Sequence, residues 1–186
     1  VLLVVGTSGE WETEGNDRRD LSLPGRQNEL IERVLEARPD AVVALNVGSP
    51  VTLDWLENCR ALLQLSFGGQ ELGHALTDIL FGDINPSGRV PTTWPVRLED
   101  TPAFPHYPGA EGRVAYGEDL WMGYRAYDTR GIEPLIPFGH GLSYTEFEYS
   151  DLRVPESTRA GQAIEVSIRV ANLGTRSGQE VVHLYV

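Results

Sequence analysis

Four carboxylates, a tryptophan and an arginine lie close together near the start of this sequence. Residues 10–18 read Glu-Trp-Glu-Thr-Glu-Gly-Asn-Asp-Arg, and they follow an apolar run at residues 1–5. The apolar run predicts a buried strand that ends at Gly6. Ligands bind at the carboxyl ends of strands in open α/β sheets, so the question is whether this loop is half of an active site or a solvated turn.

The residue types in this loop suit acid–base chemistry on a glycosidic bond. Such hydrolysis uses two carboxyl groups that flank the bond, and one of them must be protonated at the working pH. Burial or neighbouring negative charge keeps a glutamic acid protonated, and the loop offers a group of acids: Glu10, Glu12, Glu14 and Asp17. Arg18 can hold an ionised carboxylate, and Trp11 offers a flat apolar face that suits a sugar ring.

The same loop could instead be a solvated turn that pairs with itself. Residues 17–20 read Asp-Arg-Arg-Asp, and surface ion pairs of this kind contribute roughly 0–1 kcal/mol. The spacing alone leaves both interpretations open.

Other kinds of catalytic site find no support in the sequence. Residues 6–9 are not followed by Gly-Lys-Ser/Thr, and neither the dinucleotide fingerprint G-x-G-x-x-G nor the serine elbow G-x-S-x-G occurs. The four histidines lack zinc-type spacing to one another or to Cys59. We therefore predict neither a cofactor nor a metal.

The net charge of the chain argues against some classes of binding partner. A net charge of -12 and a pI of about 4.7 argue against nucleic-acid binding, which needs a basic face, and no apolar run approaches the ~20 residues of a membrane span. With one cysteine there can be no intrachain disulfide, so localisation stays open. Both ends fall inside apolar strand patterns, and we expect a piece of a longer polypeptide.

Strands and helices alternate in the segment that must position the loop. Strands are expected at residues 1–6, 41–47 and 61–67, helices at 26–37 and 70–81, and one or two helical turns at 53–58. Nearly all-apolar strands are typical of a parallel sheet covered on both faces. The predicted fold class is α/β, an α/β sandwich with a mostly parallel sheet covered by helices.

The rest of the chain has a different pattern. Residues 82–144 lack regular periodicity, but their aromatic content argues against disorder, so we expect an ordered excursion that packs on its own rings and on another surface. From residue 147 three strands are expected, two of them at 163–170 and 180–186. A sandwich needs ~7 strands, so this all-β domain of the immunoglobulin or fibronectin III type would be truncated. The predicted domains are 1–146, with its N-terminal edge left open, and 147–186.

Ordered motifs along nearly the whole chain resemble the C-terminal half of glycoside hydrolase family 3, the β-glucosidase and β-xylosidase family. The motifs are residues 10–18, 23–31, 48–51, 69–73, 81–89, 123–125 and 137–144. The resemblance implies a barrel that carries an aspartate nucleophile, then an α/β sandwich that carries the general acid/base, then a fibronectin type III-like domain. This chain would supply the second part and the start of the third, and the barrel would be its missing partner.

The resemblance also implies roles for individual residues. The general acid/base is the glutamate directly before the glycine of the Glu-Gly-x-Asp-Arg loop, which is Glu14, with Glu12 as the alternative because the length of this loop varies. Trp11 would border the aglycone, and Asp17 and Arg18 would bind substrate. The implied activity is retaining, exo-acting hydrolysis of terminal β-D-glucosyl residues, from β-linked gluco-oligosaccharides or aryl and alkyl β-glucosides, without a cofactor.

Three alternatives stand beside this interpretation. The domain could be a non-catalytic carbohydrate-binding or scaffold domain of the same fold, or the enzyme could have β-xylosidase specificity. The chain could also be an unrelated ligand-binding α/β domain with an appended sandwich. The resemblance places most of the sugar contacts in the barrel, so the choice of sugar stays open.

Overall fold

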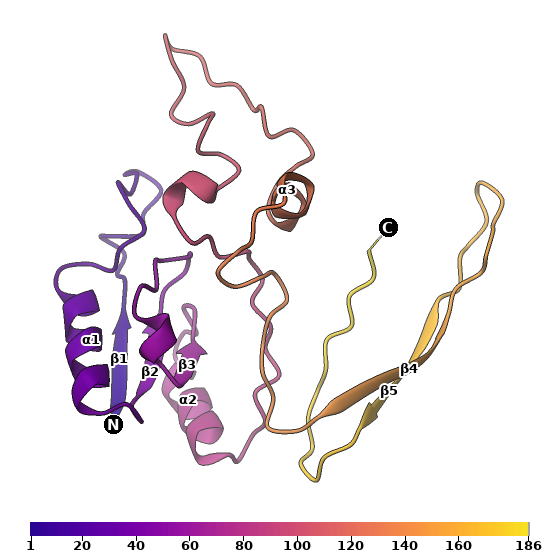
Figure 1. Cartoon of the computed structure of the whole chain (residues 1–186), viewed down its shortest axis with the longest axis horizontal. Helices are drawn as coiled ribbons and strands as arrows, with labels where there is room; N and C mark the ends of the chain where they lie inside the picture. The colour runs from indigo at the N-terminus through magenta and orange to yellow at the C-terminus, as the bar shows by residue number, and fades with distance from the viewer. Residues whose placement is uncertain (186) are drawn as a thin grey trace. The chain divides into compact units, whose positions relative to one another are not determined.

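The structure, a computed structural model, describes residues 1–185 and divides into two compact units (Figure 1). The first unit contains residues 1–74 and 90–140, and the second contains residues 75–89 and the chain from Gly141 onward. The loop with the candidate site residues belongs wholly to the first unit.

A three-stranded parallel sheet forms the centre of the first unit. Its strands are β1 (Leu2–Gly6), β2 (Val42–Asn46) and β3 (Ala61–Gln64), in the order β1-β2-β3. In β2, Val43, Ala44 and Leu45 are all 0% exposed. Because neighbouring residues of a strand point to opposite faces, both faces of β2 are covered, as the apolar run predicted.

Helix α1 (Gln27–Ala37) packs beside β1 through Ile31 and Leu35, which are buried. It confirms the helix predicted at residues 26–37. The turn η1 (Leu56–Asn58) and helix α2 (Leu72–Phe81) also form within their predicted ranges. Strand β3 is shorter than predicted, because Ser66 has a φ of 53° and this positive value ends the extended conformation.

The excursion after residue 90 is ordered by contacts within its own unit. The Trp94 backbone N–H donates to the Ile136 carbonyl at 2.8 Å, and the Trp94 side chain is only 2% exposed. The excursion contains the turn η2 (Leu98–Asp100) and helix α3 (Tyr124–Arg130). Helix α3 was not predicted; it is short, and the positive φ of Gly123 and Gly131 bounds it on both sides.

The second unit contains a two-stranded antiparallel sheet, β4 (Phe147–Arg153) and β5 (Ser167–Asn172). The strand predicted at 163–170 therefore begins four residues later, and the strand predicted at 180–186 was wrong for its described part. Residues 180–185 form no strand. Alternation of apolar and polar residues indicates which side chains share a face, but a strand also needs a neighbouring backbone with which to form hydrogen bonds. Residue 186 lies outside the described residues.

The fold is thus a parallel sheet with helices, followed by a small antiparallel sheet, which agrees with the predicted class. None of the helices within residues 1–185 combines the length and the hydropathy that crossing a bilayer requires.

Two adjacent residues of α1 offer a test of the core. Ile31 is 0% exposed and Leu30 is 48% exposed. Ile31→Ala should lower the free energy of unfolding by about 2–4 kcal/mol, because it leaves a cavity under the helix. Leu30→Ala, the matched control, should cost under about 1 kcal/mol. Urea titration followed by tryptophan fluorescence measures both, and equal losses would place the core elsewhere.

Candidate functional site

The candidate loop is a turn built on the carboxyl end of β1. The backbone N–H groups of Trp11 and Glu12 both donate to the Ser8 carbonyl at 2.9 Å. An antiparallel bridge then joins Thr13 to Asn16 and leaves Glu14 and Gly15 at the tip. Glu14 is exposed, and within residues 1–185 its carboxylate accepts no hydrogen bond and forms no ion pair.

The Glu12 carboxylate is held by three donors. The Thr7 hydroxyl and the Gly48 backbone N–H donate to Oε1, the latter at 3.1 Å, and the Ser49 hydroxyl donates to Oε2 at 3.0 Å. Gly48 and Ser49 follow β2, so this carboxylate ties the loop after β1 to the loop after its neighbouring strand. Glu12 is half-buried.

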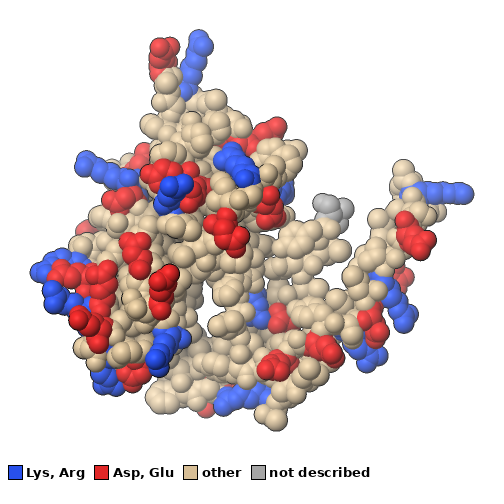
Figure 2. Space-filling model, in the orientation of Figure 1, with Lys and Arg blue, Asp and Glu red and all other residues tan. Residues whose placement is uncertain are grey.

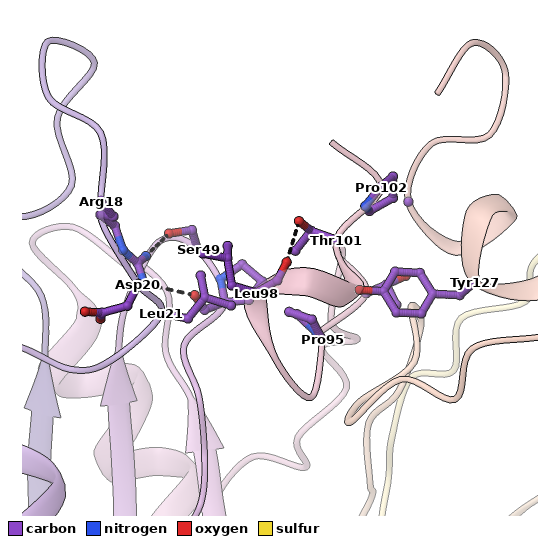
Figure 3. Close-up of a pocket in the computed structure, with 12 residues that line it drawn as sticks. Arg18, Asp20, Leu21, Ser49, Pro95, Leu98, Thr101, Pro102 and Tyr127 are labelled. Carbon is purple, nitrogen blue, oxygen red and sulfur yellow. Dashed lines mark hydrogen bonds between the residues drawn. The ribbon is translucent and has the colours of Figure 1, made fainter. Parts of the chain in front are cut away.

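Arg18 attaches the other side of the loop to the same place. Its Nη1 donates to the Ser49 hydroxyl at 2.8 Å, and its Nη2 donates to the Pro50 carbonyl at 3.3 Å (Figure 3). The Nε of Arg18 is buried without a partner in the described part of the chain. Glu12 and Arg18 therefore meet through one serine hydroxyl.

An open pocket of about 210 Å³ lies beside Arg18 (Figure 3). Its walls are mainly apolar and come from the loops after β1 and β2 and from the excursion: Arg18, Asp20, Leu21, Ser49, Pro50, Thr93, Pro95, Leu98, Thr101, Pro102, Gly123 and Tyr127. Burial, and then the nearby charge of Asp100, raise the pKa of the Tyr127 phenol. Tyr127 is thus kept neutral against the η2 segment.

Asp17 links the loop to the excursion. The Tyr107 hydroxyl donates to Asp17 Oδ2 at 2.5 Å. This hydrogen bond, with smaller contributions from desolvation and from the Asp17 charge, raises the pKa of the Tyr107 phenol. A segment 90 residues away in sequence therefore contacts the loop directly.

The structure brings only some of the predicted residues together. Glu12 and Arg18 converge on Ser49, whereas Trp11, Glu14 and Asp17 are exposed. Of the five, only Arg18 lines the pocket. Ser49 was not among the predicted site residues, although its position just after a predicted strand was a usable signal, and no motif pointed to Tyr107.

The surface charge is mixed in sign. On the face that Figure 2 shows, acidic and basic side chains are interspersed, and the sequence contains 27 acidic and 15 basic residues. A polyanion needs a continuous basic stripe, and this face offers none among the residues drawn in colour.

Comparisons with known proteins agree on one family. The model of the glycosyl hydrolase family 3 C-terminal domain matches residues 1–144. A beta-glucosidase from Rhizobium radiobacter is 49% identical over the whole chain, and a thermostable beta-glucosidase B from Acetivibrio thermocellus is 48% identical. The crystal structure of a beta-glucosidase from Kluyveromyces marxianus in complex with glucose superimposes on 95% of the chain, with a TM-score of 0.86 and 44% identity.

These relatives are much longer than the chain. It spans 23% and 25% of the two curated relatives, and the match covers 21% of the crystallised protein.

The contact between Tyr107 and Asp17 predicts a measurable titration. The raised pKa means that the phenol keeps its proton, and the hydrogen bond, at pH values where a free tyrosine (pKa about 10) begins to ionise; the bond is lost as the pH rises through the raised value. Absorbance at 295 nm, compared between the wild-type chain and Tyr107→Phe, should show one late-titrating phenol.

Asp17→Asn should move that titration to lower pH, because the charged acceptor is gone. An unchanged midpoint in Asp17→Asn would contradict the assignment.

Proposed function

The chain belongs to glycosyl hydrolase family 3, and from that premise we propose that it is the part of a retaining β-glucosidase that supplies the general acid/base, Glu14. Glu14 directly precedes Gly15 in the Glu-Gly-x-Asp-Arg segment that carries this role in the family it resembles. The names of the relatives, beta-glucosidases from several organisms, support the substrate class.

The observation that carries the proposal is the position of Glu14 between two anchors. Glu12 on one side and Arg18 on the other are both fixed to the loop after β2. Asp17 accepts the Tyr107 hydroxyl. Between these anchors Glu14 is the acid whose carboxylate has no partner in the described chain, so it is free to meet a substrate.

The proposed reaction has two steps. An aspartate of the barrel attacks the anomeric carbon while Glu14 gives its proton to the departing glycosidic oxygen, and a glycosyl-enzyme forms. Glu14 then takes a proton from water, whose oxygen attacks the anomeric carbon and releases the aspartate. Retention of configuration requires the two carboxyl groups to lie about 5–5.5 Å apart. The substrates would be β-linked gluco-oligosaccharides and aryl or alkyl β-glucosides.

The excursion is the proposed contact with the barrel. It exposes a run of large apolar side chains: Phe104, Tyr107, Val114, Tyr116, Leu120, Trp121 and Met122. These exposed side chains come from one segment of the chain, and exposed apolar surface of this kind can mark an interaction site. Tyr107 connects this segment to the Glu14 loop. The proposed α/β domain ends at residue 146, two residues beyond the family match.

Glu14→Gln in the full-length protein tests the proposed role. The amide cannot donate a proton to the leaving group, so kcat/KM for phenyl β-glucoside should fall about 10²–10⁴-fold. Glu10→Gln is the control, because Glu10 is an exposed acid of the same loop that lies outside the two anchors and has no partner within residues 1–185; it should retain wild-type turnover.

Retained turnover in Glu14→Gln would move the role to Glu12. A wild-type protein that binds but does not hydrolyse the glucoside would instead indicate the scaffold alternative, and preference for phenyl β-xyloside would indicate xylosidase specificity.

A second test uses the 186-residue chain alone. We expect it to release no phenol from an aryl β-glucoside, because the nucleophilic carboxylate would be on the barrel. Overnight incubation with absorbance detection measures this, and turnover that co-purifies with the chain through two columns would refute the division of roles.

A further inference from the structure

We infer that Ser49 is a positioning residue for the Glu14 turn, acting through the clamp formed by Glu12, Ser49 and Arg18. The inference rests on the proposed function of Glu14. Ser49 does not reach the tip of the loop; it holds the two segments that lead into and out of it.

The hydroxyl of Ser49 can serve both charged partners at once. A serine hydroxyl has one donor and two acceptor positions. Here Oγ donates to Glu12 Oε2 at 3.0 Å and accepts from Arg18 Nη1 at 2.8 Å. Hydrogen bonds to ionised groups are roughly twice as strong as neutral ones, and all three side chains are shielded in part from water. The clamp therefore restrains both ends of the tip segment together.

The backbone around Ser49 is shaped for this contact. The Gly48 N–H donates to the Glu12 carboxylate, and a Cβ at Gly48 would lie 2.8 Å from Glu12 Oε2 and 2.6 Å from the Phe67 ring. Only glycine leaves room for the carboxylate there. The Pro50 carbonyl accepts from Arg18 at 3.3 Å, so three consecutive residues after β2 all hold the loop.

The clamp should matter for proton transfer more than for sugar binding. A misplacement of 1 Å at a reacting group can cost 10²-fold in rate, and the group that the clamp positions is the proposed proton donor. Loosening the clamp should therefore slow the hydrolysis of a substrate whose leaving group needs a proton. It should not slow the hydrolysis of one whose leaving group departs readily as an anion.

The experiment compares two substrates in the full-length protein. Phenyl β-glucoside releases a phenol with a pKa of about 10 and needs acid assistance, whereas 2,4-dinitrophenyl β-glucoside releases a far more acidic phenol. Ser49→Ala should lower kcat/KM about 10–100-fold for the first substrate and less than about 3-fold for the second.

Three variants control this comparison. Ser49→Thr keeps the hydroxyl and should have most of the activity that Ser49→Ala loses. Ser49→Cys keeps the size of the side chain but has a much weaker hydrogen-bond donor, and it is used in place of Ser49→Ala if that variant does not fold. Ser22→Ala should leave both rates unchanged, because the Ser22 hydroxyl makes no hydrogen bond in the described part of the chain and only its backbone N–H is used.

The outcomes separate the two proposals. Equal losses on both substrates, or no loss on either, would overturn the positioning role of Ser49. Glu14→Gln is measured in parallel: a strong dependence on the leaving group in Glu14→Gln without one in Ser49→Ala refutes the clamp and leaves the proposed function standing. Absence of that dependence in Glu14→Gln refutes the proposed function itself.

Discussion

The candidate site depends on the parallel alignment of β1 with β2. Gly6 pairs with Asn46 in the register of the sheet, and the ladder continues one step further, because the Thr7 N–H donates to the Asn46 carbonyl at 3.1 Å. The loops after both strands therefore start at the same level, which lets Glu12 reach Gly48 and Ser49. The junction is tight: a Cβ at Gly6 would lie 2.1 Å from the Asn46 carbonyl oxygen. The side chain of Gln27, at the start of α1, bonds both the N–H and the carbonyl of Gly6 at 2.8 Å.

The acids of the short loop that follows this junction differ in their hydrogen-bond partners. The Glu12 carboxylate accepts hydrogen bonds from the Thr7 and Ser49 hydroxyls and from the Gly48 backbone N–H, and Asp17 accepts one from the Tyr107 hydroxyl. Glu14 is separated from them by a turn that its neighbours close. Chemically similar side chains take separate functions when their environments differ, and here the donors that distinguish them come from the loops after β1 and β2 and from the excursion.

The sequence alone predicted the features that follow from local periodicity. The apolar strands, helix α1, helix α2 and the acidic loop after the first strand all came from patterns within about a dozen residues. The convergence of Glu12 and Arg18 on Ser49 could not be read in this way, because it depends on the register between two strands and on a side-chain reach across 37 positions of sequence. The contact between Tyr107 and Asp17 depends on how an irregular segment folds back, for which the pattern holds no signal. Helix α3 was missed because its bounds are set by two glycines with positive φ and not by an apolar stripe.

The exposure of the turn agrees with the proposed division of roles between this chain and the barrel. A general acid needs a water-poor setting that keeps its proton until the leaving group departs, and the tip of this loop faces solvent within the chain. The chain provides a sheet edge and the hydrogen bonds that join Glu12 and Arg18 to Ser49 on either side of the tip. The setting would have to come from the surface that covers the tip, which under the proposed function is the barrel with its substrate. Under the proposed function, the rigid part and the enclosing part belong to separate modules, so Glu14 would act as a proton donor only where the nucleophile is also present.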